Sequence, residues 1–211
     1  MSNSDYVLGE PIENYIKLRQ LDKYMIGHKG YIAGGVFKNI FNSEPFKDVD
    51  IFFENEKDYV EADTYYKGKE GYEVVYQNDK VTAYKDKEND ITLELIKHKY
   101  KSPLDMVDEF DFTITKFVYY KSVNPNDNDE VLWNVAYHMK FFEHLHMKRL
   151  VVDQEVKNII LPVNTYNRMF RYARYGYFPC RETKAKIIEA LRELPRFSEE
   201  LLSQELYNGL D

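Results

Sequence analysis

The sequence is poor in cysteine and has no long apolar runs. Cys180 is the single cysteine among 211 residues, so no internal disulfide can form, which favours a reducing compartment. No apolar stretch approaches the roughly 20 residues that a membrane helix needs. The polar, acidic first residues also lack the basic start and apolar core of a secretory signal. We therefore expect a soluble, cytoplasmic protein that has no membrane partner.

The charge is spread unevenly along the chain. A net charge of -7 argues against a protein that coats nucleic acid without specificity. Between Lys148 and Arg196, however, eleven Lys and Arg stand against five Asp and Glu. An acidic front and a basic rear predict two different surfaces, of which the rear one is suited to phosphates. The abundance of Lys, Asn, Tyr and Ile favours an AT-rich genome, such as that of a phage or mobile element.

Hydrophobic periodicity divides the chain into a mixed first part and a helical last part. Strands are expected at residues 31–33, 48–53, 91–97 and 112–120, with a hairpin at 72–84 and a polar loop at 122–130. Helices are expected at residues 13–28, 36–41, 54–67, 163–175, 184–194 and 198–207. The pattern predicts an α+β domain over residues 1–152, followed by a small helical domain over residues 153–211.

Two aspartates alternate with apolar residues in the stretch DVDIFF, which starts at Asp48. In a strand, residues i and i+2 point to the same face, so Asp48 and Asp50 would project side by side while Val49 and Ile51 enter the core. Two carboxylates held this close repel each other unless a cation lies between them. Mg²⁺ favours carboxylate oxygens and takes waters and substrate phosphates as its other ligands. The pair therefore predicts a magnesium site of the two-metal type that supports in-line phosphoryl displacement.

A double glycine precedes these aspartates in the stretch YIAGGVFKN. Gly34 and Gly35 lack Cβ atoms, so they can form a strand-to-helix turn and let backbone N–H groups approach a triphosphate. Lys38, one turn into the following helix, adds a positive charge. An acidic pair on a strand is more often a solvated edge than a metal site. Glycines and aspartates in this order and spacing nevertheless predict a nucleotide site.

These motifs resemble the nucleotidyltransferase superfamily of DNA polymerase β, in particular the head and neck of CCA-adding enzymes and bacterial poly(A) polymerases. The family's opening motif reads roughly GGxVRD followed by DxD. Gly34, Gly35, Phe37 and Lys38 stand at the positions of its Gly, Gly, Val and Arg, and Asn39 replaces its Asp.

Three later stretches continue the resemblance. ELIKHK, which begins at Glu94, is similar to a family strand that ends in Arg. EFDFTITKFVYY is similar to RRDFTINALAY, and Asp111 lies in its matching part. RMFRYARYGYF is similar to the neck motif RAIRFAARLGF, with Arg168 and Arg171 at matching positions.

The resemblance implies a mixed β-sheet with flanking helices, followed by a helical neck. It also implies that Asp48 and Asp50 bind Mg²⁺ together with a third carboxylate, for which Glu94 and Asp111 are the two candidates. Arg168 and Arg171 are expected to contact the NTP or RNA. From the pattern alone, these arginines could equally form a solvated helix face.

The sequence departs from the family where CCA-adding enzymes read the incoming base. Pro162 and Thr165 stand in place of an acidic residue and an arginine, so the base-selecting template is missing or rebuilt. Three functions remain open. The first is transfer of a nucleoside monophosphate to an RNA 3′ end. The second is transfer to a protein or small-molecule acceptor. The third is a catalytically silent module that binds nucleotide, RNA or a protein partner.

Overall fold

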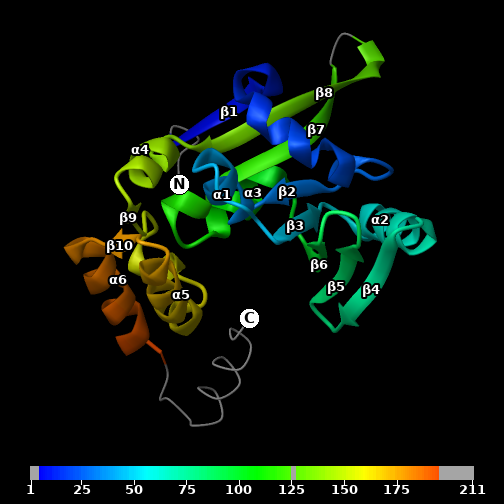
Figure 1. The fold of residues 1–211 in the computed structure, drawn as a ribbon. Coiled ribbons are helices and arrows are strands. Elements are labelled where there is room, and N and C mark those ends of the chain that lie inside the picture. The colour runs from blue at the N-terminus through cyan, green and yellow to red at the C-terminus, as the bar shows by residue number, and fades with distance from the viewer. Residues whose placement is uncertain (1–4, 125–126, 195–211) are drawn as a thin grey trace. The chain divides into compact units, whose positions relative to one another are not determined.

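An eight-stranded mixed sheet organises the first part of the chain (Figure 1). The structure is a computed structural model that describes residues 5–124 and 127–194. The strands lie in the order β1 (Tyr6–Pro11), β8 (Asp127–His138), β7 (Phe117–Asn124), β2 (Tyr31–Ala33), β3 (Asp48–Phe53), β6 (Ile91–Lys99), β5 (Val81–Asp86) and β4 (Tyr72–Gln77). Neighbouring strands are antiparallel except β3 and β6, which are parallel. The predicted α+β class is confirmed.

Alternation along β3 gives the sheet two different faces. Val49, Ile51 and Phe53 have no exposed surface, and they lie on one face. Asp48 and Asp50 lie on the other, because successive side chains of a strand point to opposite sides. The same alternation carries across to β6, whose Leu93 and Leu95 are also fully buried.

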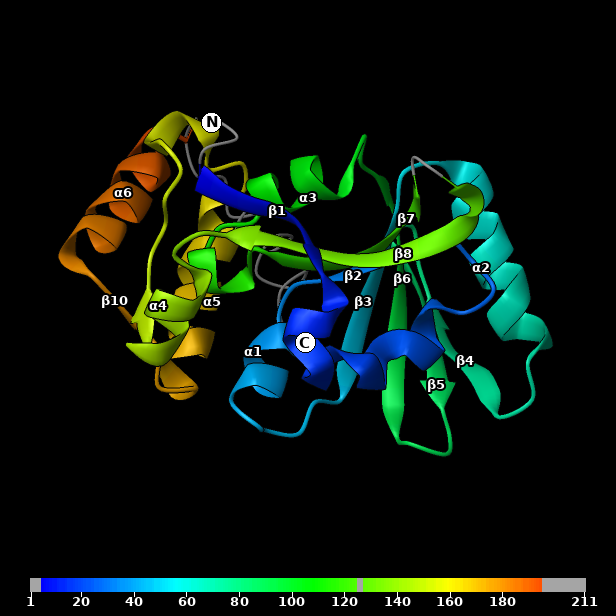
Figure 2. The same cartoon turned by 90° about the horizontal axis from the view of Figure 1, so that it is seen from above.

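Helices cover the two faces unequally. The apolar face packs against η2 (Ile12–Met25), a 3₁₀ helix, and against α1 (Val36–Phe41) and α2 (Glu56–Gly68). The opposite face packs against one short helix, α3 (Pro103–Glu109), whose Met106 and Val107 contact Ala33, Val118 and Ala136. Figure 2 shows α3 and α1 on opposite sides of the sheet. α3 also reaches Phe52 of β3 and Ile96 of β6. Asp48, Asp50 and Glu94 lie on the same face of these two strands but outside this apolar cluster, and we call their area, together with the same face of β5 and β4, the open face.

Local signals explain where these helices begin. The side chain of Asn55 accepts a hydrogen bond from the N–H of Asp58 at 3.0 Å, which caps α2. Ser102 caps α3 in the same way, and Pro103 occupies the first turn, where a missing N–H costs nothing. Both helices therefore start where a polar residue satisfies a backbone donor that has no partner within the helix.

The described chain forms two compact units. The first holds the residues up to Phe110 and from Thr115 to Met139, and the second holds Asp111–Ile114 and the residues from Lys140 onward. The predicted domain boundary after residue 152 stays a prediction, because compactness does not test which segments fold independently.

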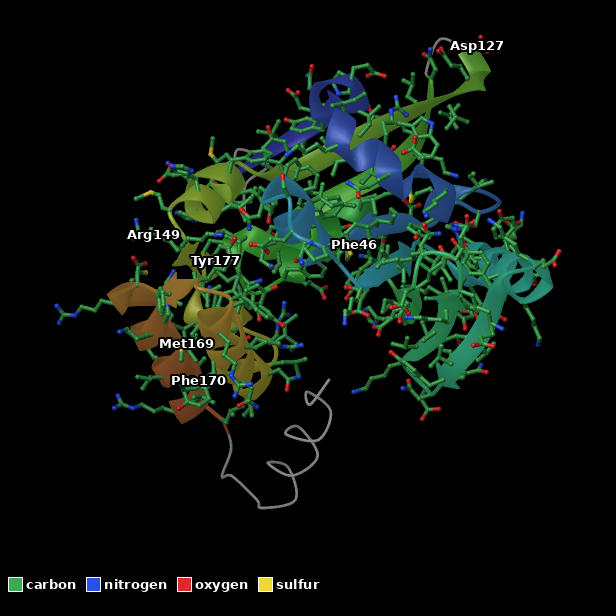
Figure 3. The ribbon with its side chains drawn as sticks, viewed as in Figure 1. Phe46, Asp127, Arg149, Met169, Phe170 and Tyr177 are labelled. Atoms are coloured by element: carbon green, nitrogen blue, oxygen red, sulfur yellow. The ribbon has the colours of Figure 1, made fainter. Side chains whose placement is uncertain are left out.

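The second unit is mainly helical. Its elements are α4 (Phe141–His146), β9 (Arg149–Leu150), η4 (Val156–Asn158), α5 (Pro162–Arg174), β10 (Phe178–Pro179) and α6 (Arg181–Arg192). β9 and β10 form a short parallel pair, and Tyr177 is fully buried beside it (Figure 3). None of the helices within residues 5–124 and 127–194 is long and apolar enough to cross a membrane.

Two predicted elements have a different form. Residues 113–115 form a 3₁₀ turn, η3 (Thr113–Thr115), and the strand expected from residue 112 starts only at Phe117. Thr113 N–H donates to the Val151 carbonyl at 3.0 Å, and Thr113 Oγ1 is hydrogen-bonded to His144 Nδ1 at 2.8 Å, so its partners lie outside the sheet. The segment expected as a helix at 13–28 consists of two 3₁₀ stretches that meet at Tyr15, whose φ of -133° and ψ of 50° are not helical. Its buried Leu18, Leu21 and Tyr24 recur every three residues, which is the 3₁₀ period.

The polar segment expected as a loop is largely strand. Ser122–Asn124 belong to β7 and Asp127–Glu130 belong to β8, and Val123 is paired with Val131. Asp127 lies at the tip of this hairpin (Figure 3). The polar composition therefore reflects an exposed two-stranded arm. The helix expected at residues 198–207 lies outside the described residues.

Candidate active site

The open face brings two carboxylate-bearing strands together. Asp48 lies opposite Thr92, and Asp50 lies opposite Glu94, in the parallel pairing of β3 with β6. Residues paired in this way project to the same side of a sheet, about 4.8 Å apart at the backbone. Asp48 is exposed, whereas Asp50 and Glu94 are half-buried. The structure therefore places Asp48, Asp50 and Glu94 on one exposed patch of one face.

The loop before β3 is held by residues of α1. Asn39 Nδ2 donates to the Pro45 carbonyl at 2.6 Å, and Lys38 Nζ donates to Glu44 Oε2 at 3.4 Å. The chain then enters β3, where Thr92 N–H donates to the Lys47 carbonyl at 2.7 Å. These bonds fix the entry to Asp48. Lys38 is the predicted phosphate contact. Its residue is only 6% exposed, and its side chain is directed to Glu44 in this loop.

Gly34 lies directly against Asp50. It adopts a φ of +92°, and a Cβ atom built on it would lie 3.3 Å from Asp50 Oδ2. Its N–H donates to the Phe117 carbonyl at 3.4 Å, within the sheet. Gly35 begins α1 with an ordinary helical φ of -66°. Gly34 thus needs glycine both for its backbone conformation and for the close approach of the carboxylate, whereas the φ of Gly35 makes no such demand.

Glu94 has a partner that sequence reasoning missed. Tyr76 Oη, on the edge strand β4, donates a hydrogen bond to Glu94 Oε1. Tyr76 and Glu94 lie two strands apart, and the register of three strands is needed to bring them together. No local sequence signal could have identified this pair.

Asp111 lies in the second unit, where it pairs with an arginine. Its Oδ2 lies 3.3 Å from Arg168 Nη1, and its residue is 6% exposed. Burial raises the pKa of the Asp111 carboxyl, and the nearby Arg168 guanidinium opposes this rise. The Arg168 guanidinium also lies 5.9 Å from the ring centre of buried Tyr172, which packs edge-on against Phe112. The ion pair thus belongs to the packing of α5.

The remaining predicted contact, Arg171, is half-buried in the last turn of α5. The helix carries Met169 and Phe170 beside it (Figure 3), and Phe170 is 50% exposed and packs edge-on against Tyr166. Tyr172 is buried whereas Tyr175 is 54% exposed, so the side of α5 that carries Arg168 and Arg171 is partly core.

Oxygen ligands of the open face suit a hard cation such as Mg²⁺. In the parts of the chain that the structure describes, no three His, Cys, Asp or Glu side chains lie close enough to hold a metal ion by themselves. Asp48 and Asp50 from one strand and Glu94 from the next are nevertheless the right chemical type. Such a set fits a cation that takes its further ligands from water and phosphate.

A sequence model described as "Gabija anti-defense 2 family protein", Gad2, matches residues 11–148. The chain belongs to the Gad2 family. The match includes all three carboxylates of the open face and ends before α5. Comparison of this Gad2-family chain with curated proteins gave no match.

Solved structures share the fold of this Gad2-family chain. A tRNA nucleotidyltransferase complexed with a primer tRNA and an incoming ATP analog is 22% identical, with a TM-score of 0.55 over 82% of this chain and 49% of that one. A CCA-adding enzyme in apo form I is 16% identical, with a TM-score of 0.57 over 86% and 42%. A CCA-adding enzyme complexed with CTP is 18% identical, with a TM-score of 0.55 over 94% and 46%.

These similarities confirm the polymerase-β-like nucleotidyltransferase fold that the four motifs predicted. At such identities the likeness concerns the fold. The chain spans about half the length of the solved structures that it matches.

Proposed function

We propose that the protein is a nucleotidyltransferase that moves a nucleoside monophosphate from an NTP to an acceptor hydroxyl. The observation that carries the proposal is the placement of Asp48, Asp50 and Glu94 on the open face, in register across two parallel strands. The fold shared with tRNA nucleotidyltransferases supports it. In the reaction, the acceptor oxygen bonds to the α-phosphorus as the bond to pyrophosphate breaks.

Asp48 and Asp50 would hold a divalent cation, with Mg²⁺ as the expected ion. When bound, such a cation neutralises the triphosphate and the charge that develops in phosphoryl transfer. The chain's own contribution is to keep negatively charged oxygens at fixed positions on a rigid strand. This is the positioning and electrostatic role that supplies most of the effect in this class of reaction.

Glu94 is the better candidate for the third carboxylate. It is paired with Asp50 on the neighbouring strand, and its partner Tyr76 is uncharged. Asp111 is buried against the guanidinium of Arg168, which already balances its charge. We therefore assign the catalytic role to Glu94 and a packing role to Asp111.

Nucleotide binding is proposed for the turn of Gly34 and Gly35, which borders Asp50. Because the N–H of Gly34 is bonded to Phe117, we expect Gly34 to contribute by its missing side chain. Lys38 and Arg171 remain proposed contacts. Arg168 would have to give up or share its ion pair with Asp111 to reach a nucleotide.

The first candidate acceptor is an RNA 3′ end. The basic segment from Lys148 to Arg196 and the tRNA named with one structural neighbour support this choice. The second candidate is a protein of the opposed defence, because the family description names anti-defense. A Gad2-family chain that transferred nucleotide to such a protein would act as a covalent inhibitor.

Both acceptors can be tested with α-labelled NTPs and Mg²⁺. Purified protein is incubated with total cellular RNA or with a lysate of cells that carry the defence, and RNA and protein products are resolved on denaturing gels. Asp48→Asn removes one carboxylate of the open face, and Asp79→Asn makes the same charge change in the exposed hairpin turn. We expect label in RNA or protein with wild type and Asp79→Asn, and loss of more than about 100-fold with Asp48→Asn. Equal labelling by the two variants would refute the site.

A further inference from the structure

Four residues form a row across the open face. Register pairs Tyr76 of β4 with Ala83 of β5, Ala83 with Glu94 of β6, and Glu94 with Asp50 of β3. Adjacent strands lie about 4.8 Å apart, so the backbones at Tyr76 and Glu94 are separated by roughly 10 Å. A direct contact across this distance needs two long side chains and a short one between them.

Ala83 supplies the short side chain. Its methyl group leaves room for Tyr76 Oη to reach Glu94 Oε1, and Ala83 has no exposed surface although it lies between two residues of the open face. The chemistry of the donor also matters. A lysine or arginine here would neutralise Glu94, whereas a tyrosine hydroxyl orients the carboxylate and leaves its charge in place.

A lysine on the same face of β5, Lys85, is engaged by another carboxylate. Lys85 lies in the adjacent row of this face, where it is paired with Thr92 of β6, which in turn is paired with Asp48 of β3. Its Nζ lies 2.6 Å from Asp90 Oδ1 and donates to the Asp90 carbonyl at 2.9 Å. In the row of Glu94, the carboxylate is therefore hydrogen-bonded by a neutral donor, Tyr76.

We propose that Tyr76 is the positioning residue of Glu94 in cation binding. It holds one carboxylate oxygen, Oε1, from the edge strand, so that the orientation of the carboxylate is fixed before the cation arrives. This inference rests on the proposed function, since it assigns Glu94 to the cation site. Removing a partner that orients a metal-binding carboxylate typically lowers metal affinity or activity about 10- to 100-fold.

The test measures Mn²⁺ binding by titration calorimetry with no nucleotide present, so that catalysis does not enter the readout. Tyr76→Phe removes only the hydroxyl. Tyr72→Phe makes the same change on the same strand, where Tyr72 packs against Tyr66 of α2 on the other face. We expect Tyr76→Phe to raise the Kd about 10-fold or more, with Tyr72→Phe unchanged. Glu94→Gln and the double variant with Tyr76→Phe should bind equally weakly, because the hydroxyl acts through Glu94.

The outcomes separate this inference from the function on which it rests. If Glu94→Gln weakens binding while Tyr76→Phe binds as tightly as wild type, or more tightly, positioning by Tyr76 is wrong and the site stands. If Asp50→Asn and Glu94→Gln both leave Mn²⁺ binding unchanged, the proposed cation site itself fails. Additive losses in the double variant would show that Tyr76 acts on the cation independently of Glu94, which also overturns the proposal.

Discussion

Replacing Gly34 by alanine should harm the site more than the fold, and the chain contains a matched control. Gly34 has a φ of +92° and Gly71, before β4, has a φ of +88°. A side chain in this region of φ costs roughly 1–2 kcal/mol, so Gly34→Ala and Gly71→Ala should lose similar backbone stability. The two glycines differ in their surroundings. A Cβ at Gly34 would meet Asp50 Oδ2 at 3.3 Å, whereas a Cβ at Gly71 would meet nothing within 4 Å.

The closeness of this contact sets the expected effect on function. A methyl carbon at 3.3 Å is tighter than an ordinary contact, so the Asp50 carboxylate must shift by a few tenths of an ångström. Misplacement of about 1 Å in a reacting site can cost about 100-fold in rate. We therefore expect Gly34→Ala to reduce transfer, and Mn²⁺ affinity, by roughly 10-fold relative to Gly71→Ala.

Two measurements on both variants test this reasoning. Urea unfolding gives the free energy of unfolding, and calorimetry with Mn²⁺ gives the metal affinity. Similar losses of stability with a selective loss of Mn²⁺ binding in Gly34→Ala would support the argument. Equal Mn²⁺ binding by both variants would refute it, because the contact with Asp50 would then have no consequence and only the backbone would require glycine.

Three further predictions concern stability. Burial and Lys121 lower the pKa of His28 from 6.5 to about 4, so the unfolded state takes up a proton first as the pH falls. The contribution of His28 to the free energy of unfolding is therefore complete above pH 6.5. As the pH falls from 6.5 towards 4, it should decline by about 1.4 kcal/mol per pH unit, about 3 kcal/mol in all. Urea titrations should show this slope in wild type, and a His28→Gln variant with the same slope would contradict it. Asn55→Ala should cost about 1 kcal/mol by uncapping α2, and Asn55→Ser, which keeps a side-chain acceptor for the N–H of Asp58, should cost less; equal unfolding midpoints for the two would contradict the cap. Arg168→Met should cost about 2 kcal/mol by leaving Asp111 buried and unpaired, less than a fully buried pair because the Arg168 side chain is 33% exposed. Adding Asp111→Asn should restore part of this loss in a double-mutant cycle, and strict additivity would rule out the coupling.

The elements with strong local signals could be predicted closely. The helix Val36–Phe41 and the strand Asp48–Phe53 have the predicted bounds. The first follows a glycine turn, and the second has the period of two that one buried face imposes. The hairpin turn at Asn78 is also local, since its side chain accepts from the N–H groups of Lys80 and Val81.

Predictions that depended on distant partners were less accurate. Residues 112–116 have the composition of a strand, yet Thr113 bonds to Val151 and His144 and turns instead. Residues 127–130 have the composition of a loop, yet they belong to β8, which pairs with β7. Composition reports solvent exposure and local preference, whereas strand pairing depends on which other segment is present.

The carboxylate site also has one part that depends on neighbouring residues and another that depends on distant segments. That Asp48 and Asp50 share a face behind a glycine turn could be predicted without a structure, because it follows from the geometry of residues that are neighbours along the chain. The sequence left Glu94 and Asp111 as equal candidates, since neither lies near the pair along the chain. The fold was needed to show that β6 runs parallel to β3 with Glu94 opposite Asp50, and that Asp111 is buried against Arg168. Strand order and burial are properties of the whole fold, and no local pattern encodes them.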